Sequence, residues 1–314
     1  MKKALYYLLQ WFLLTILGAL VLMIPAFIVG LIAGGLTNSD DIMSNGWVLS
    51  ISNIGSQLLP LYVFWKKKYA DFSFLWSGRA LKFYMSVVVL AISCFLIESV
   101  FEQYVTLPDW EWMSYDDVMQ MMLNPIGLIS VCLLAPLIEE ALFRGAIERT
   151  LLKKGFNPWT AIIFSAALFG LVHLNLVQGV PAFFWGIVLG WVYYRTRSIW
   201  PGVLIHFIVN TLSSVLTILS QHYPAIDGPM SSSVSLTVLF VGIILLIAAL
   251  KQVNKDADGV ELSSSSTFLD DADIKAIAIA QYQASRNIAE TASPDSVPAE
   301  DVVLPPEDNI NKES

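Results

Sequence analysis

The fold of this chain is decided by the stretch Ile138-Glu139-Glu140-Ala141-Leu142-Phe143-Arg144, which lies in an otherwise apolar segment from Cys132 to Leu152. A charge at membrane depth costs at least about 2.5–3.5 kcal/mol on insertion scales. Two adjacent carboxylates cost more, because they also repel each other. An ionisable cluster inside a membrane-crossing segment therefore predicts a functional site.

The composition is that of a polytopic membrane protein. Of the 314 residues, 56% are apolar and only 14% are charged, whereas soluble domains carry about 25% charged residues. The net charge of -8 belongs to the C-terminal tail, since residues 1–250 contain 13 Lys+Arg and 13 Asp+Glu and residues 251–314 contain 5 and 13. An acidic tail does not suggest nucleic-acid binding. Cys94 and Cys132 lie in apolar runs, which predicts small buried side chains and no disulfide.

Apolar segments long enough to cross a bilayer occur eight times along the chain. They cover about 5–35, 47–65, 83–105, 126–152, 158–176, 180–195, 201–220 and 233–250, of which the first is long and the sixth short. The first run is longer than the apolar region of a signal peptide, so we expect it to be retained. We therefore expect an all-α helix bundle of about eight transmembrane helices in the plasma or inner membrane.

Clusters of Lys and Arg fall at alternate breaks between these segments, from Lys2 and Lys3 to Lys251 and Lys255. By the positive-inside rule, both termini are predicted to be cytoplasmic. The longest external connection, Thr106–Pro125, contains Trp110 and Trp112 among acidic residues. It is typical of a segment that lies on the lipid headgroups, and a substrate lid is the alternative.

Four regions follow from this organisation. They are 1–125 (three helices and the external connection), 126–220 (the helices with the charged residues), 221–253 (the last helix) and 254–314 (the acidic tail). The tail is predicted to be mostly disordered, with a short helix at about 272–286. We expect it to be solvated, and the alternative is that it binds a cytoplasmic partner.

The charged residues of the fourth segment divide by helical spacing. Glu140 and Arg144 are separated by four residues, so they share a helix face and can pair, and Arg144 and Glu148 repeat this spacing. Glu139 lies about 100° around the helix from Glu140 and has no cation on its own helix. Glu140 is therefore predicted to be held and charged, and Glu139 is a candidate general base.

Two histidines occur in apolar segments, and each needs a polar partner in lipid. His173 follows Phe169 near the end of the fifth segment, and His206 precedes Asn210 by four residues in the seventh. At 1.5 Å per residue, Glu139 and His173 lie at similar depths, about 20 and 22 Å from the cytoplasmic ends of their helices. His206 lies only about 10 Å and Asn210 about 16 Å from theirs, so Asn210 is expected to reach Glu139 more easily.

Two chemistries are open to these residues. A glutamate could deprotonate a water that attacks an amide, while His and Asn donors stabilise the oxyanion. Alternatively, Glu139, His173 and His206 could bind a divalent metal such as zinc. Neither an HExxH motif nor a G-x-S-x-G serine is present, and no organic cofactor is expected. Proton-coupled transport is a third class, which the lack of internal repeats disfavours.

Together these residues resemble a known family. Glu139-Glu140-x-x-x-Arg144, Phe169-x-x-x-His173 and His206-x-x-x-Asn210 are similar, in order and spacing, to the three motifs of the CPBP family, the CAAX proteases and bacteriocin-processing enzymes. The resemblance covers about residues 126–220. It implies an intramembrane endopeptidase that acts on a peptide or protein substrate at the lipid bilayer.

The resemblance also implies roles for individual residues. Glu139 would activate the water with help from His173, Glu140 and Arg144 would support the site, and His206 and Asn210 would form the oxyanion hole. Family descriptions differ on whether a metal is needed. Some members are similar to bacteriocin-immunity proteins or to regulators without proteolytic activity. A membrane scaffold or immunity protein with the same fold is therefore the alternative function.

Overall fold

The computed structural model describes residues 1–33, 45–72, 81–108, 115–223 and 228–258, and every regular element among them is a helix. Trp110, Trp112 and the tail helix predicted at about 272–286 lie outside these residues. The two cysteines are buried and free, as predicted. The predicted all-α membrane bundle is thus confirmed.

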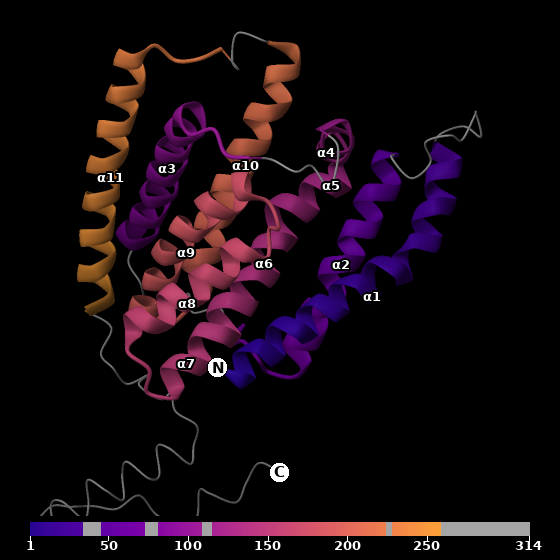
Figure 1. Cartoon of the computed structure of the whole chain (residues 1–314), viewed down its shortest axis with the longest axis horizontal. Coiled ribbons are helices and arrows are strands. Elements are labelled where there is room, and N and C mark those ends of the chain that lie inside the picture. The colour runs from indigo at the N-terminus through magenta and orange to yellow at the C-terminus, as the bar shows by residue number, and fades with distance from the viewer. Residues whose placement is uncertain (34–44, 73–80, 109–114, 224–227, 259–314) are drawn as a thin grey trace, which may run out of the picture. The chain divides into compact units, whose positions relative to one another are not determined.

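Seven stretches among the described residues are long and apolar enough to cross a membrane, so the chain is a multi-pass membrane protein. They are α1 (Lys2–Ala33), α2 (Gly46–Lys66), α3 (Leu81–Tyr104), a continuous helix over Pro125–Lys153, α9 (Leu176–Thr196), α10 (Trp200–His222) and α11 (Ser232–Asp258) (Figure 1). A short helix, α4 (Tyr115–Met122), precedes the fourth stretch.

The remaining predicted segment, the fifth at about 158–176, corresponds to α8 (Pro158–Leu171), which has only 14 residues and is therefore about 21 Å long. The prediction that the sixth segment is the short one is wrong, because α9 has 21 residues. The helix break comes earlier than expected, since the side chain of Asn175 accepts a hydrogen bond from the Val177 N–H and caps α9 there. The short helix is thus the one that leads to His173.

α8 and α9 form an antiparallel hairpin whose backbones approach closely at glycines. A Cβ added to Gly170 would lie 2.6 Å from the Gly179 carbonyl oxygen, and one added to Gly186 would lie 2.9 Å from Ala166. Gly190, one turn further, packs on side chains instead, because a Cβ added there would lie 2.8 Å from Glu148 Oε2 and 3.1 Å from Ile162 Cγ2. This close packing holds the turn between the two helices, which contains His173, next to the fourth membrane stretch.

The fourth stretch is not a uniform α-helix. It runs through α5 (Pro125–Ile129), the π-helix η2 (Ser130–Leu134), α6 (Ala135–Glu140), the π-helix η3 (Ala141–Glu148) and α7 (Arg149–Lys153). The two glutamates therefore end a short α-helical piece between two π-helical ones. π-Helical turns inside α-helices occur frequently at functional sites.

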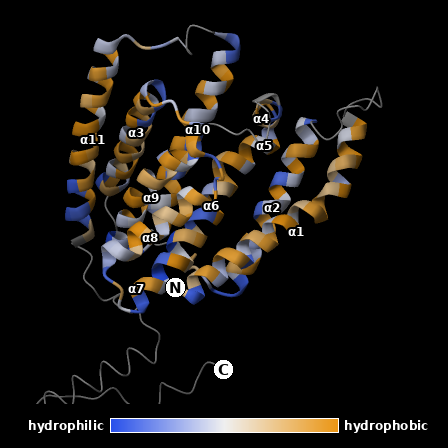
Figure 2. Cartoon of the chain, viewed as in Figure 1, coloured by the Kyte–Doolittle hydropathy of each residue, from blue (hydrophilic) through white to orange (hydrophobic). Residues whose placement is uncertain are grey.

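Two apolar cores form around this stretch. One joins α1, α2, η3 and α8 through residues such as Tyr7, Phe64 and Phe143, and the other joins α3, α9, α10 and α11. Hydrophilic residues gather where α7 ends and where α1 begins (Figure 2). At the start of α3, Lys82 pairs with Asp256 of α11 at 3.1 Å. The assignment of these helix ends to the cytoplasmic side stays a prediction.

Candidate active site

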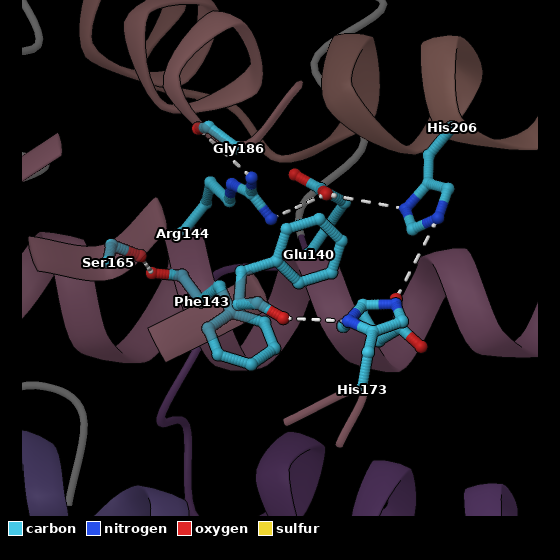
Figure 3. A network of polar contacts seen from close by, with 9 residues as sticks. Glu140, Phe143, Arg144, Ser165, His173, Gly186 and His206 are labelled. Atoms are coloured by element: carbon cyan, nitrogen blue, oxygen red, sulfur yellow. Dashed lines mark hydrogen bonds and ion pairs between the residues drawn. The ribbon is translucent and has the colours of Figure 1, made fainter. Parts of the chain in front are cut away.

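Glu140 and Arg144 form a fully buried ion pair, as predicted from their spacing. Arg144 Nη1 lies 2.9 Å from Glu140 Oε1, and both side chains have no exposed surface. Arg144 Nη2 donates a second hydrogen bond to the carbonyl oxygen of Gly186 on α9, at 3.2 Å (Figure 3). The guanidinium also stacks 4.7 Å from the ring centre of Phe169. Glu140 is therefore fixed in place by the partners of Arg144.

The second predicted pair, Arg144 with Glu148, is not formed. Both carboxylate oxygens of Glu148 are buried and have no hydrogen-bond partner among the described residues. Arg144 and Glu148 both lie in η3, whose backbone bonds run from residue i to i+5, as the bond from Arg149 N to Arg144 O shows. Long side chains on a helix point back toward its N-terminus, so Arg144 reaches Glu140 and, across to α9, Gly186, and not Glu148.

Glu139 has a different environment from its neighbour. Its side chain is 21% exposed, and its Oε2 lies 3.7 Å from His206 Nε2. The other ring nitrogen of His206 lies 3.6 Å from Glu140 Oε1. His206 is therefore placed between the two carboxylates (Figure 3). Both distances exceed those of a direct hydrogen bond, and at such separations a water can connect the groups.

The expectation from depth that Asn210 reaches Glu139 more easily than His206 does is not met by these contacts. The reason is the position at which α10 begins. Ser198 and Ile199 are buried, so the chain turns into α10 inside the protein. Gly202 then packs directly on Glu140, because a Cβ added there would lie 2.6 Å from Glu140 Oε2. His206, one turn further, consequently lies level with the glutamates.

We expect Gly202→Ala to impair the site, because the new methyl group would displace the Glu140 carboxylate that Arg144 and His206 both face. Activity should fall by more than about tenfold, with a loss of stability of about 1–3 kcal/mol from overpacking. The measurement is substrate cleavage together with thermal unfolding in detergent. A variant with wild-type activity would show that the contact at Gly202 does not matter for Glu140.

His173 lies in the turn that follows α8. Its Nδ1 is 2.8 Å from the carbonyl oxygen of Phe169. Since a carbonyl can only accept, we assign the ring proton of neutral His173 to Nδ1, which leaves a lone pair on Nε2. The Phe169 ring packs edge-on against both histidines, with ring centres 5.2 Å from His173 and 5.8 Å from His206. The next residue, Leu174, has a φ of 53°, a strained backbone conformation for a leucine that lies next to the site.

Asn210 makes a different contact from the one that the resemblance implies. Its side-chain Nδ2 donates to the carbonyl oxygen of Val131 in η2, at 3.0 Å. Asn210 therefore links α10 to the fourth membrane stretch at Val131, on the N-terminal side of the two glutamates. Its role in an oxyanion hole stays a prediction.

The metal hypothesis named Glu139, His173 and His206 as ligands. Among the residues that the structure describes, no group of three or more His, Cys, Asp or Glu side chains is placed to hold a metal ion. The metal hypothesis stays a prediction, and the proposed reaction uses the side chains alone.

Two acidic residues of α3 were not singled out from the sequence. Glu98 and Glu102 line a cavity of about 130 Å³ between α3 and α10, together with Ser213 and Thr217. Two carboxylates four residues apart in an apolar segment are the same signal that identified Glu139 and Glu140. Pro136 and Gly202 were also missed, because a sequence does not show which backbone groups meet other helices.

The segment that contains this geometry also matches a known family. Residues 122–212 match the model of type II CAAX prenyl endopeptidase Rce1-like proteins. The chain carries an Rce1-like domain. The resemblance to the CPBP family is thereby confirmed over these residues, and the fold is that of a CAAX-type intramembrane protease. The Rce1-like domain contains Glu139, His173, His206 and Asn210, whereas α1, α2, α3 and α11 lie outside it.

Two curated proteins resemble part of the chain. "Putative membrane peptidase YdiL" of Bacillus subtilis (strain 168) is 30% identical over 100 residues, which are 32% of this chain and 40% of that protein. "UPF0177 protein YaiF" of Lactococcus lactis subsp. lactis (strain IL1403) is 24% identical over 141 residues, which are 44% of this chain and 63% of that protein. The chain thus spans less than two thirds of either relative. No solved structure matches it.

Proposed function

We propose that this membrane protein is an endopeptidase that hydrolyses a peptide bond of a membrane-associated substrate, with Glu139 as the base that activates water. The observation that carries the proposal is the difference between two adjacent glutamates. Glu140 is fully buried and paired with Arg144 at 2.9 Å, whereas the Glu139 side chain is 21% exposed and faces His206. A general base needs a free lone pair and access to water, which the partial exposure of Glu139 allows and the burial of Glu140 does not.

In the proposed reaction, Glu139 takes a proton from a water as the water oxygen attacks the carbonyl carbon of the substrate. The C=O electron pair moves onto the carbonyl oxygen, which becomes an oxyanion. His206 Nε2, carrying a proton, donates a hydrogen bond to this oxyanion. When the C–N bond breaks, the leaving nitrogen receives the proton that Glu139 holds. The products are an amine and a carboxylic acid, and Glu139 is restored.

His173 orients the attacking water in this scheme. Its Nδ1–H is engaged by the Phe169 carbonyl, so its Nε2 lone pair can accept a hydrogen bond from the water. The Phe169 carbonyl fixes the ring in the same way that a backbone carbonyl or carboxylate orients a catalytic histidine in other enzymes. Replacement of His173 should therefore slow the attack without removing the base.

In the proposed scheme Glu139 itself activates the water, so we expect hydrolysis to proceed without a bound metal. Purified protein should keep its cleavage rate within about twofold after dialysis against a chelator, since a metal-activated water would be lost with its ion. Elemental analysis of the dialysed protein is the control. A loss of activity that zinc restores would replace this mechanism with a metal-dependent one.

The proposal is tested in cells that express the wild-type protein, Glu139→Ala or His173→Ala, by comparing the fragments of membrane proteins. We expect fragments that are present with the wild type, lost with Glu139→Ala and reduced with His173→Ala. If both variants keep every wild-type fragment and phenotype, the protein is not a protease of this kind, and a scaffold role takes its place. The fragments would also identify the substrate. The binding of a cytoplasmic partner by the acidic tail is a separate prediction, which this experiment does not address.

A further inference from the structure

The Val131 carbonyl of the fourth membrane stretch lacks the backbone partner that either an α-helix or a π-helix would give it, and Pro136 is part of the cause. The Ala135 N–H donates to Ser130 O, five residues back, as in a π-helix. In an α-helix Val131 O would pair with the N–H of residue 135, and in a π-helix with the N–H of residue 136. The N–H of Ala135 is directed to Ser130 O instead. Residue 136 has no N–H to offer, because it is proline.

The side chain of Asn210 fills this gap. Its Nδ2 reaches across from α10 to Val131 O at 3.0 Å. An unpaired carbonyl in a membrane interior costs several kcal/mol, and prolines in membrane helices are tolerated where a neighbouring side chain satisfies the freed group. The bond is thus accounted for by the local sequence of the fourth stretch alone, without reference to a substrate.

The same bond has a consequence for the site. Asn210 lies one turn beyond His206 on α10, and Val131 lies two turns before Glu139 on the fourth stretch. Where Asn210 Nδ2 is held on Val131 O, α10 cannot slide or rotate along the stretch that carries the glutamates. The His206 nitrogens are then held 3.6 and 3.7 Å from Glu140 and Glu139.

We propose that Asn210 is a positioning residue, which caps the Val131 carbonyl left open by Pro136 and so sets His206 against Glu139. This inference rests on the proposed function for its effect on catalysis. It differs from the oxyanion-hole role that the family resemblance implies for Asn210. A donor to the oxyanion would act on the substrate whatever residue stands at position 136, whereas a cap is needed only because that residue is proline.

A double-mutant cycle separates the two roles. The four proteins are wild type, Asn210→Ala, Pro136→Ala and the double variant, and the alanine that replaces the proline supplies a backbone N–H. We expect Asn210→Ala to lower the cleavage rate by about tenfold to a hundredfold with proline present, as for a lost bond to a buried group. With alanine in place of the proline the same change should cost less than about threefold. An equal loss in both backgrounds would overturn the inference and favour an oxyanion donor.

Thermal unfolding of the same four proteins in detergent keeps the inference testable if Pro136→Ala is inactive. Asn210→Ala should lower the unfolding temperature clearly when proline is present and little when alanine is present. Equal shifts in the two backgrounds would contradict the cap. Because unfolding requires no substrate, this result stands even if the proposed hydrolysis is wrong.

Ser93→Ala is the matched control for both measurements. Ser93 is buried in α3, and its Oγ donates to Leu90 O of the same helix at 2.7 Å. The variant removes a buried hydrogen bond from the Ser93 hydroxyl to the Leu90 carbonyl. Unlike the Val131 carbonyl, this carbonyl is not near a proline. Its effect on rate and on unfolding should be the same whether position 136 holds proline or alanine.

Discussion

Glu139→Gln is expected to abolish detectable cleavage, with a loss of at least about 10²–10⁴ in rate, because the amide cannot take a proton from water. The variant should fold normally. Glutamine has the same shape as glutamate, and the Glu139 side chain is 21% exposed. Its Oε2 lies 3.7 Å from His206 Nε2, so no short ion pair is lost. The measurement is the cleavage rate of a substrate identified from the membrane fragments, in purified protein with a confirmed unfolding temperature.

Glu102→Gln is the matched control for this substitution. Glu102 is also a carboxylate in a membrane-crossing helix, but it lines the cavity between α3 and α10 and makes none of the contacts of the site. Its cleavage rate should stay within about threefold of wild type, as expected for a residue outside the reacting groups. If Glu139→Gln cleaves as fast as Glu102→Gln, Glu139 is not the base.

Arg144→Met is expected to destabilise the protein more than any other single change discussed above. Glu140 and Arg144 are fully buried and 2.9 Å apart, so removal of the arginine leaves an uncompensated carboxylate in the interior. Breaking a buried pair in this way costs about 3–5 kcal/mol. The free energy of unfolding in detergent measures the loss, and activity should fall with it because Glu140 loses the group that fixes it.

Two further variants test the cause. The double variant Glu140→Gln/Arg144→Met removes the stranded charge and should regain a large part of the lost stability, because the penalty lies in the unpaired ion. Lys82→Met breaks the pair with Asp256, in which the lysine side chain is 62% exposed, and should cost no more than about 1 kcal/mol. A loss for Arg144→Met as small as that for Lys82→Met would contradict the role given to the buried pair.

The Glu140–Arg144 pair could be predicted because it depends only on helical spacing. Residues four apart lie near each other on a helix surface, and the pair forms between Glu140, the last residue of α6, and Arg144 in η3. The eight apolar segments were also predictable, because the membrane selects for length and apolarity. In both cases the deciding physics acts within one segment of the chain.

The contacts between segments were not predictable in the same way. His206 reaches the glutamates because α10 begins inside the protein and its Gly202 packs on Glu140. The depth estimate failed because it assumes that every helix begins at the membrane surface. The predicted Arg144–Glu148 pair failed because the terminal nitrogens of Arg144 are bonded to Glu140 and to the Gly186 carbonyl of another helix. The hydrogen bond from Asn210 to Val131 was not predictable either, since it joins two helices at a carbonyl that a proline has freed.

Incorporation of oxygen-18 from labelled water tests the central claim most directly. Membranes that contain the wild-type protein or Glu139→Gln are incubated in this water, and the new C-termini of membrane proteins are analysed by mass spectrometry. If Glu139 activates a water that attacks the peptide carbonyl, the wild type yields C-termini with heavy oxygen, and Glu139→Gln yields none of them. Labelled C-termini at the same level in both membranes would contradict the account.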